Sequence, residues 1–279
     1  MTGDYIAHYR EYGYAVVENL FRREEVAELA AAFDRVYAEA LKHPASYRHQ
    51  NVFFRITNDA RLGRMVRLVQ WPSYFDVTLD RCRLDRRIVE VLAPLIGTDL
   101  KQIINQLHWK PPGAAMAEFG YHQDVRFRRP RSAFRDLPGA YVQTGIAIDP
   151  HVAGNGCMRV VPGSHLMGEL PLGGTSAILD QRANEAELRR VGIDPGRAVD
   201  LVLAPGDMAL WHLHTVHGSG SNHSPGDRRL YVNGYVSAAC ADRGAWAFRR
   251  GEPCALGEPV LIHFEDLYRR PEPHYVDAV

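Results

Sequence analysis

The feature that most constrains the fold is a change of pattern about one hundred residues into the chain. Before this point, apolar residues recur at steps of three and four, as in helices that bury one face. After it come short β-rich runs, separated by clusters of Gly, Pro, Asn and Asp and with no helical pattern between them. Serial short strands favour a sandwich or barrel over an α/β sheet. We therefore expect a mainly β fold with flanking helices.

The first hundred residues are expected to be mostly helical. Residues 4–12 predict a short helix, and REEVAELAAAFDRVYAEALKHP (23–44) predicts a long one whose apolar positions recur every three or four residues. Its core positions are Val26, Leu29, Phe33, Val36 and Ala40. A further helix is expected near 82–96, and residues 14–20 predict a short strand. The stretch 44–80 is interpreted as loops.

The remainder predicts the β-rich part of a single domain that spans residues 1–279. Residues 1–100 would provide helical support and a substrate-loop region, and residues 101–270 would form a β-barrel core. Residues 171–199 read as an insertion between strands, long enough to form a lid or surface flap. The expected strands lie within 101–110, 140–149, 156–163, 197–213, 228–236 and 259–264.

Composition excludes several classes of function. The formal net charge is +0, so no overall basic field indicates a nucleic-acid partner. No apolar run approaches the roughly 20 residues of a membrane span, and the start of the chain lacks the apolar region of a signal peptide. The four cysteines are far apart and form no C-x-x-C pair, which predicts free thiols and a cytoplasmic location.

A histidine and an aspartate two residues apart form the start of a candidate metal site. In a strand, residues i and i+2 point to the same face, so His122 and Asp124 of YHQD would point together. Such a pair is weak by itself, because it arises often by chance. A non-heme iron site of the two-histidine, one-carboxylate type also needs a second histidine.

That second histidine is expected from a distant segment, WHLHTVHGSGSNHSPGDRRLYVNGYV. Of its four histidines, His217 is favoured because it stands at a strand end, before a turn-forming stretch. Arg228 follows eleven residues later, and a hairpin would place the two on adjacent antiparallel strands. Its guanidinium fork suits the carboxylate of a co-substrate. Alternation places Arg228 on an inward face with Leu230 and Val232.

Four stretches together resemble the phytanoyl-CoA dioxygenase family of Fe(II)/2-oxoglutarate-dependent oxygenases. They are YREYGYAVVENLFRREEVAEL, YHQD, GNGCMRVVPGSHLMG and PGDMALWHLHTVHGSGSNHSPGDRRLY, and they occur in the family's order over most of the chain. The resemblance implies a double-stranded β-helix, which is a cupin-like jelly-roll barrel with helices packed on one sheet. This agrees with the change of pattern from helices to strands.

Carried over residue by residue, the resemblance implies the roles of five positions. His122, Asp124 and His217 would bind Fe(II). Arg228 would bind the distal carboxylate of 2-oxoglutarate, and Ser219 would assist it. O2 would be the second co-substrate, and succinate and CO2 the products. Because related halogenases replace the carboxylate ligand with a small residue, the presence of Asp124 disfavours halogenation.

Other polar residues are expected near the site from strand alternation. Gln143 lies on the small, partly polar face of the run AYVQTGIAID and is a candidate contact of the co-substrate. Gln106 and His108 alternate on INQLHWK and are further candidates. By contrast, we interpret three histidines as structural, namely His165, His212 and His214.

A run of arginines follows the H-x-D pair directly and has two interpretations. It could be a solvated strand end with surface ion pairs, or a clamp for an anionic substrate. If the strand continued beyond Asp124, Arg126 and Arg128 would share the face of the metal ligands. Arg126 is the substrate-binding candidate, for a phosphate, phosphonate, carboxylate or CoA-linked substrate.

The predicted activity is oxidation, most simply hydroxylation, of a small molecule that is anionic or a secondary metabolite. The same site would also support desaturation, ring closure or epoxidation, and the sequence does not choose among these reactions. The alternative is a cupin-like metal isomerase, or a non-catalytic binding protein, that uses no 2-oxoglutarate. Arg228, at its spacing from His217, argues against that alternative.

Overall fold

Two antiparallel sheets form the body of the protein. The computed structural model describes residues 4–114, 118–172, 184–259 and 273–276. Neighbouring strands of the large sheet follow the order β1 (Tyr14–Val17), β10 (Met208–His212), β7 (Tyr141–Ala147), β12 (Arg228–Ser237), β5 (Leu100–Lys110), β4 (Gly63–Gln70), β3 (Val52–Asp59), β2 (Tyr47–His49) and β15 (His274–Tyr275). β13 (Ala245–Arg249) also pairs with β5, and with β14 (Glu252–Pro253). The small sheet has the order β6 (Phe119–His122), β11 (His217–Ser219), β8 (Met158–Val160) and β9 (Val199–Asp200).

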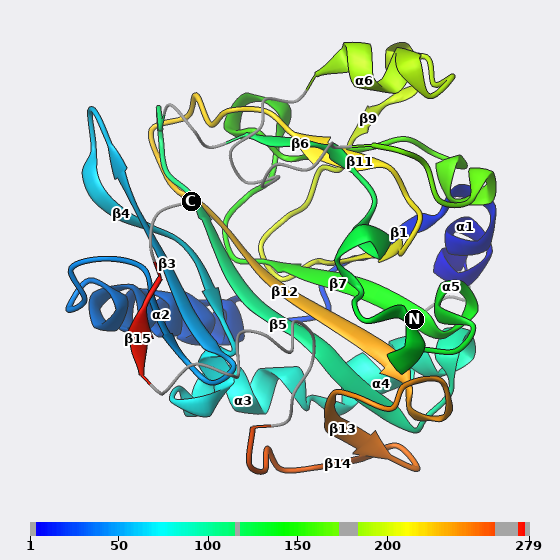
Figure 1. Ribbon diagram of the computed structural model, residues 1–279, viewed down its shortest axis with the longest axis horizontal. Helices are drawn as coiled ribbons and strands as arrows, with labels where there is room; N and C mark the ends of the chain where they lie inside the picture. The colour runs from blue at the N-terminus through cyan, green and yellow to red at the C-terminus, as the bar shows by residue number, and fades with distance from the viewer. Residues whose placement is uncertain (1–3, 115–117, 173–183, 260–272, 277–279) are drawn as a thin grey trace.

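Helices cover one side of the large sheet, and the small sheet lies on the other. Figure 1 shows α2 (Arg23–Ala40), α3 (Val77–Arg83) and α4 (Arg86–Ile96) along one side of the large sheet, with β6 and β11 on the opposite side. The other helices are α1 (Asp4–Tyr12), α5 (Leu137–Ala140) and α6 (Glu185–Arg190). No helix within the described ranges is both long and apolar enough to cross a membrane.

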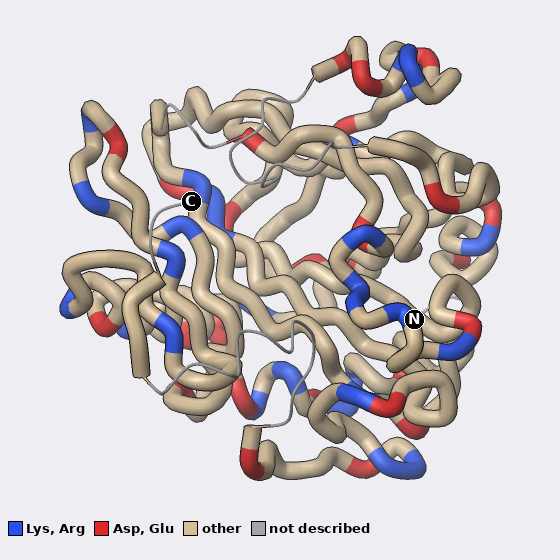
Figure 2. The backbone as a smooth tube through the Cα atoms, viewed as in Figure 1, with Lys and Arg blue, Asp and Glu red and all other residues tan. Residues whose placement is uncertain are grey.

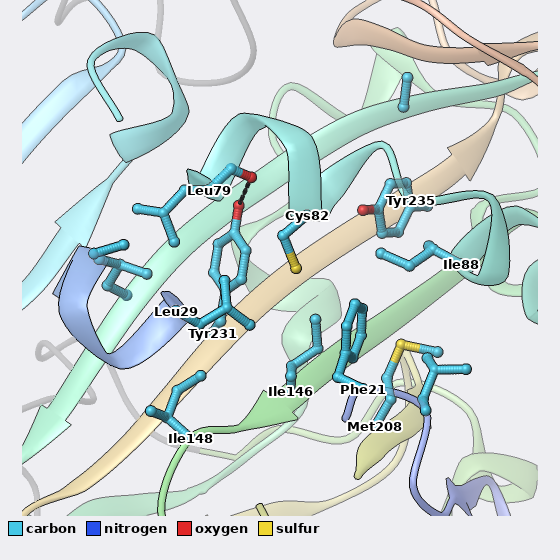
Figure 3. Packing of buried hydrophobic residues seen from close by; sticks show 14 of the residues in the cluster. Phe21, Leu29, Leu79, Cys82, Ile88, Ile146, Ile148, Met208, Tyr231 and Tyr235 are labelled. Carbon is cyan, nitrogen blue, oxygen red and sulfur yellow. Dashed lines mark hydrogen bonds between the residues drawn. The ribbon is translucent and has the colours of Figure 1, made fainter. Parts of the chain in front are cut away.

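The main core lies between these helices and the large sheet (Figure 3). Leu79 and Ile88 are fully buried there, and each such side chain contributes about 1.5–3 kcal/mol relative to exposure. Two tyrosines of β12 attach the sheet to the helix backbone: the Tyr231 hydroxyl donates to the Leu79 carbonyl at 2.9 Å and the Tyr235 hydroxyl to the Arg83 carbonyl at 2.8 Å. The side chains on one face of β12 therefore pack in this core, and those on its other face point into the space between the two sheets.

The expected mainly β, jelly-roll fold class is confirmed, and so are the long helix and most of the strands. All five core positions expected on α2 are buried. The helix expected near 82–96 is two helices, because Asp85 accepts the backbone N–H of Arg87 and begins α4. The strand expected within 259–264 lies almost wholly outside the described residues.

The expectation of loops over 44–80 is wrong. This stretch holds β2, β3 and β4, and β4 pairs with β5, so the hairpin extends the large sheet. The missed signal is its turn, in which one Asp59 carboxylate oxygen accepts the N–H groups of Arg61 and Leu62. Gly63 then adopts a positive φ of 70° at the start of β4. The first hundred residues therefore contribute strands as well as helices.

The lid expected over residues 171–199 stays a prediction. Part of this stretch, residues 173–183, lies outside the described residues. The part that follows contains α6, a short 3₁₀ turn at Pro195–Arg197 and the start of β9. α6 begins at Asn184, whose side chain accepts the backbone N–H of Ala186.

Candidate metal centre and its cavity

Two histidines of the small sheet face each other with defined ring orientations. His122 ends β6 and His217 begins β11, and the two are paired residues in the sheet register. The Nδ1 atom of His122 lies 2.7 Å from the Gly120 carbonyl, and that of His217 lies 2.9 Å from the Thr215 carbonyl. A carbonyl can only accept, so Nδ1 carries the hydrogen in each neutral ring and Nε2 keeps its lone pair. Burial lowers the pKa of His122 to about 3, which keeps that ring neutral.

The aspartate reaches the histidines from a turn rather than from a strand. β6 ends at His122, and Asp124 begins a 3₁₀ turn, Asp124–Phe127. His122 and Asp124 therefore do not share a strand face as expected, although their two side chains do meet. Asp124 Oδ1 lies 3.9 Å from His122 Nε2, and Asp124 Oδ2 lies 3.9 Å from His217 Nε2.

A tryptophan of the large sheet holds the aspartate in place. Trp211 Nε1 donates a hydrogen bond to Asp124 Oδ2 at 2.8 Å. Burial would raise the pKa of Asp124, but its electrostatic interactions with the His217 ring and the Arg128 guanidinium outweigh this effect, so the pKa is lowered and the carboxylate is ionised. The strand that carries Trp211 was expected, but its contact with Asp124 was not, because it joins the two sheets.

The three side chains have the donor set of a non-heme iron site. One ligand atom from each of His122, Asp124 and His217 lies within 4.8 Å of the others, and this is the one such group among the described residues. Two imidazole nitrogens and one carboxylate oxygen on one side of an ion leave further coordination positions open. The Nδ1 contacts and Trp211 provide the hydrogen bonds that orient such ligands. The residues present therefore fit Fe(II).

The triad opens into a cavity of about 290 Å³ between the sheets. Its lining includes three arginines, and Asp124 is its single acidic residue within the described part of the chain. Figure 2 shows basic segments near the start of β12 and along the loop after β6. The lining comprises Arg55, Leu68, Gln70, Ile104, Gln106, His108, Phe119, His122, Asp124, Phe127, Arg128, Gln143, Met158, Trp211, His217, Gly218, Ser219, Arg228, Leu230 and Val232.

Arg228 stands at one end of this cavity. It begins β12, is 4% exposed and lines the cavity with Leu230 and Val232, as alternation predicted. Its Nη1 lies 3.3 Å from His151 Nδ1, its Nε has no hydrogen-bond partner, and no carboxylate pairs with it among the described residues. Burial lowers its pKa to about 10, so the group is still a cation at neutral pH. This end of the cavity therefore has a buried positive charge whose N–H groups can still donate hydrogen bonds to a ligand.

Ser219 lies beside this end and is held by a lysine that the sequence interpretation missed. Lys110 is fully buried, and its Nζ donates to Ser219 Oγ and to the Gly220 carbonyl, both at 2.5 Å. In the sheet register Lys110 pairs with Arg228. A signal was present, because Lys110 continues the alternation of Gln106 and His108 along β5.

The hairpin expected between His217 and Arg228 is wrong. β11 belongs to the small sheet and β12 to the large one, so the two residues meet across the cavity and not as strand neighbours. Residues 220–227 cross from one sheet to the other. The Asn222 side chain stabilises this crossing by donating to the carbonyls of Lys110 and Gly226 at 2.7 and 2.8 Å. A turn-rich stretch is compatible with either connection, and the sequence does not distinguish them.

Arg128 stands in the cavity lining, whereas Arg126 does not. Arg128 is 2% exposed, and its Nη2 donates to the Tyr141 hydroxyl at 2.7 Å and to Gln143 Oε1 at 3.1 Å. Arg126 is half-buried, lies over the ring of Phe127 and donates to the Leu172 carbonyl at 3.4 Å. Arg126 and Arg128 do not share the face of the metal ligands, because the turn at Asp124 ends the alternation of the strand.

The remaining expected residues lie partly in the cavity lining and partly outside it. Gln106 and His108 line the cavity and are joined by a hydrogen bond of 3.0 Å. Burial and the nearby arginines lower the pKa of His108 to about 3. The histidines expected to be structural lie outside the lining. Among them, His165 contacts the Arg10 carbonyl at 3.2 Å and His212 accepts the backbone N–H of His214 at 3.0 Å.

Comparison with known proteins gives consistent matches. The sequence profile described as phytanoyl-CoA dioxygenase (PhyH) matches residues 9–230. A probable alpha-ketoglutarate-dependent hypophosphite dioxygenase of Stutzerimonas stutzeri is 27% identical over 240 residues, which are 82% of this chain and 77% of that protein. The peroxisomal phytanoyl-CoA dioxygenase of Mus musculus is 27% identical over 241 residues, 83% of this chain and 67% of that protein.

Solved structures show the same fold. The crystal structure of EctD from S. alaskensis with bound Fe has a TM-score of 0.65 at 22% identity and covers 92% of this chain and 86% of that one. The alpha-ketoglutarate-dependent epimerase SnoN from nogalamycin biosynthesis has a TM-score of 0.63 at 23% identity and covers 92% of this chain and 96% of that one.

Proposed function

The chain belongs to the phytanoyl-CoA dioxygenase family, and from this premise we propose that it hydroxylates a small molecule with Fe(II) and 2-oxoglutarate, giving succinate and CO2. Fe(II)- and 2-oxoglutarate-dependent dioxygenase activity follows from the family. Hydroxylation is the finer part of the proposal, since one structural relative is described as an epimerase and another as a carbocyclase.

One observation supports the proposal most: a two-histidine, one-carboxylate triad shares one cavity with a buried arginine that has no carboxylate partner among the described residues. A metal site alone would fit an isomerase or a storage protein equally well. A buried guanidinium without a carboxylate partner is unfavourable unless an anion completes it. An anionic co-substrate that binds the metal and ends in a second carboxylate meets both requirements.

Each residue of the triad has a proposed role. His122 and His217 would bind Fe(II) through Nε2, and Asp124 would bind it through the carboxylate that Trp211 orients. When bound, Fe(II) and 2-oxoglutarate supply the oxidation of the substrate by O2. The protein contributes a buried cavity that limits access of water to this chemistry.

Further residues would hold the co-substrate. Arg228 would bind the distal carboxylate of 2-oxoglutarate with its planar fork, and Ser219, positioned by Lys110, would donate a further hydrogen bond. Gln106 and His108 lie near this end of the lining, because His108 pairs with Leu230 in the register. Gln143 lies further from Arg228, beside Arg128. A contact of Gln143 with the co-substrate would therefore involve the part of the co-substrate that binds the metal.

The test uses the protein loaded with Fe(II) without oxygen. Addition of 2-oxoglutarate should produce a weak visible metal-to-ligand absorption, and admission of O2 should then release succinate. Iron binding without this absorption would contradict the proposal and favour a cupin-like metal protein that uses no 2-oxoglutarate. Glutarate, the five-carbon diacid that lacks only the keto group of 2-oxoglutarate, is the matched control and should give no absorption.

A further inference from the structure

The cavity contains a second buried arginine without a counter-ion, at Arg128. Its side chain is 2% exposed, and no carboxylate forms an ion pair with it among the described residues. Both of its hydrogen bonds come from Nη2 and go to neutral groups, the Tyr141 hydroxyl and Gln143 Oε1. The Nε–H is buried without a partner in the described part of the chain. A cation that forms no ion pair is costly to bury, and two neutral acceptors offset only part of that cost.

Arg128 lies at the opposite end of the cavity from Arg228. Its partner Gln143 pairs with Gly234 in the register between β7 and β12, and Gly234 follows Arg228 by six residues on β12. At about 3.3 Å per residue, these attachment points lie roughly 20 Å apart along the strand. Asp124 lies between them, bound to Trp211, which itself pairs with Gln143. A five-carbon diacid held by the triad and Arg228 does not also occupy Arg128.

The charge of the cavity also calls for a second anion. Arg128, Arg228 and a bound Fe(II) contribute four positive charges, with the ligand histidines neutral. Asp124 and 2-oxoglutarate contribute three negative charges. The complex of iron and co-substrate therefore keeps one of these positive charges in a buried space, which favours an anion over a neutral or cationic substrate.

We propose that Arg128 binds an oxyanion of the substrate, a carboxylate or a tetrahedral group such as a phosphate or sulfate, and so determines which small molecules this site oxidises. The inference rests on the proposed function and adds the substrate class to it. Tyr141 and Gln143 orient the guanidinium, and its Nε–H and Nη1–H groups are left for the substrate.

The experiment measures binding of two probe anions to the complete complex. Protein with Fe(II) and saturating 2-oxoglutarate is titrated without oxygen with acetate, a planar carboxylate, and with sulfate, a tetrahedral oxyanion. Calorimetry and melting temperature report binding, and chloride at equal ionic strength is the blank. Arg128→Gln removes the charge, Arg128→Lys keeps the charge without the fork, and Arg135→Gln removes a surface arginine that pairs with Asp242.

We expect saturable binding of acetate or sulfate to the wild type and to Arg135→Gln, weakened at least about tenfold in Arg128→Gln. The stronger of the two anions identifies the shape of the substrate group. Arg128→Lys should bind that anion several-fold more weakly than the wild type, which tests the site even if Arg128→Gln folds poorly. Equal binding by all variants, or no binding beyond chloride, would show that Arg128 only ties Tyr141 to Gln143. The visible absorption with 2-oxoglutarate separates the two proposals, because its absence from the wild type contradicts the proposed function itself.

Discussion

Each end of the cavity has a buried arginine, but one arginine lies on a strand and the other on a loop. Arg228 and Arg128 are both buried and lack a carboxylate partner among the described residues. Arg228 begins a ten-residue strand paired on both sides, with β5 and with β7. Arg128 follows a 3₁₀ turn and is oriented by Tyr141 and Gln143 of β7. A strand holds a group in a fixed place, whereas a loop can change its residues without disturbing the sheets.

This difference suits the two proposed ligands, 2-oxoglutarate at Arg228 and the substrate at Arg128. A co-substrate is the same in every turnover, and the end fixed by strand register suits it. A substrate differs from one enzyme to another, and a loop-borne arginine is suited to select it. The metal centre lies between the ends and is itself mixed, since its histidines come from paired strands and its aspartate from the turn that leads to Arg128.

Removing the metal centre should abolish the function of both ends. Asp124→Ala deletes the ligand that both histidines approach at 3.9 Å. We expect succinate release to fall by more than about 100-fold, beyond the loss seen when only a partner of a ligand is removed. Fe(II) binding and the absorption with 2-oxoglutarate should weaken together. Asp200→Ala removes an exposed carboxylate from the small sheet that carries the two histidines and should retain activity. A fully active Asp124→Ala would refute the triad.

Arg228→Gln tests the strand-borne end alone. We expect the Kd of 2-oxoglutarate to rise by about 100-fold, because a buried charge would lose its partner. Titration of the visible absorption measures this directly. Arg229→Gln is the matched control, since Arg229 lies on the other face of β12 and pairs with Asp149 at 2.9 Å. It should lower the melting temperature and leave the Kd of 2-oxoglutarate unchanged.

Trp211→Phe tests the link between the large sheet and the turn. The change keeps an aromatic side chain, although a smaller one, and removes the N–H that donates to Asp124 at 2.8 Å. Loss of such a hydrogen bond to a metal ligand weakens metal binding by about 10- to 100-fold, and we expect the lower part of this range. Equilibrium Fe(II) titration provides the measurement. Trp246→Phe, on β13, should bind iron as the wild type does, and equal affinities in both variants would exclude a positioning role for Trp211.

Combining Arg128→Gln with Arg228→Gln tests whether the two ends are separate. Effects of sites more than about 10 Å apart usually add, so their losses should multiply to within about twofold. Each single variant should weaken mainly its own ligand, the probe anion for Arg128 and 2-oxoglutarate for Arg228. A coupling well above twofold would show that one ligand spans both arginines.

Arg126→Ala should have the smallest effect. Arg126 lies outside the cavity lining, and its contacts include the Phe127 ring and the Leu172 carbonyl. Substitutions of this kind usually change stability by less than about 0.5 kcal/mol, and we expect succinate release to change by less than about twofold. If Arg126→Ala lost more succinate release than Arg128→Gln, the substrate anion would be assigned to Arg126 and not to Arg128.

The sequence was informative wherever a strand period runs without interruption. Alternation along 228–236 correctly separated the cavity face of Arg228, Leu230 and Val232 from the core face of Tyr231 and Tyr235. It was misleading at Asp124, where a turn replaces the strand, and over 44–80, where a short turn at Asp59 hid a hairpin. At Asp124 the local pattern carries no record of the turn, because the residues around it are compatible with either structure, whereas Asp59 and Gly63 are a turn signal that the interpretation missed.

The sequence alone determined the mainly β class and the long helix, because these depend on periods within one element, and its resemblance to a known family indicated the candidate residues of the triad with Arg228. The tertiary structure decided which elements meet. It placed β11 and β12 in different sheets, brought Trp211 to Asp124 and Lys110 to Ser219, and turned Arg128 rather than Arg126 into the cavity. Each of these contacts joins segments far apart in the chain, or depends on one turn, and is therefore fixed by packing of the sheets and not by any local period.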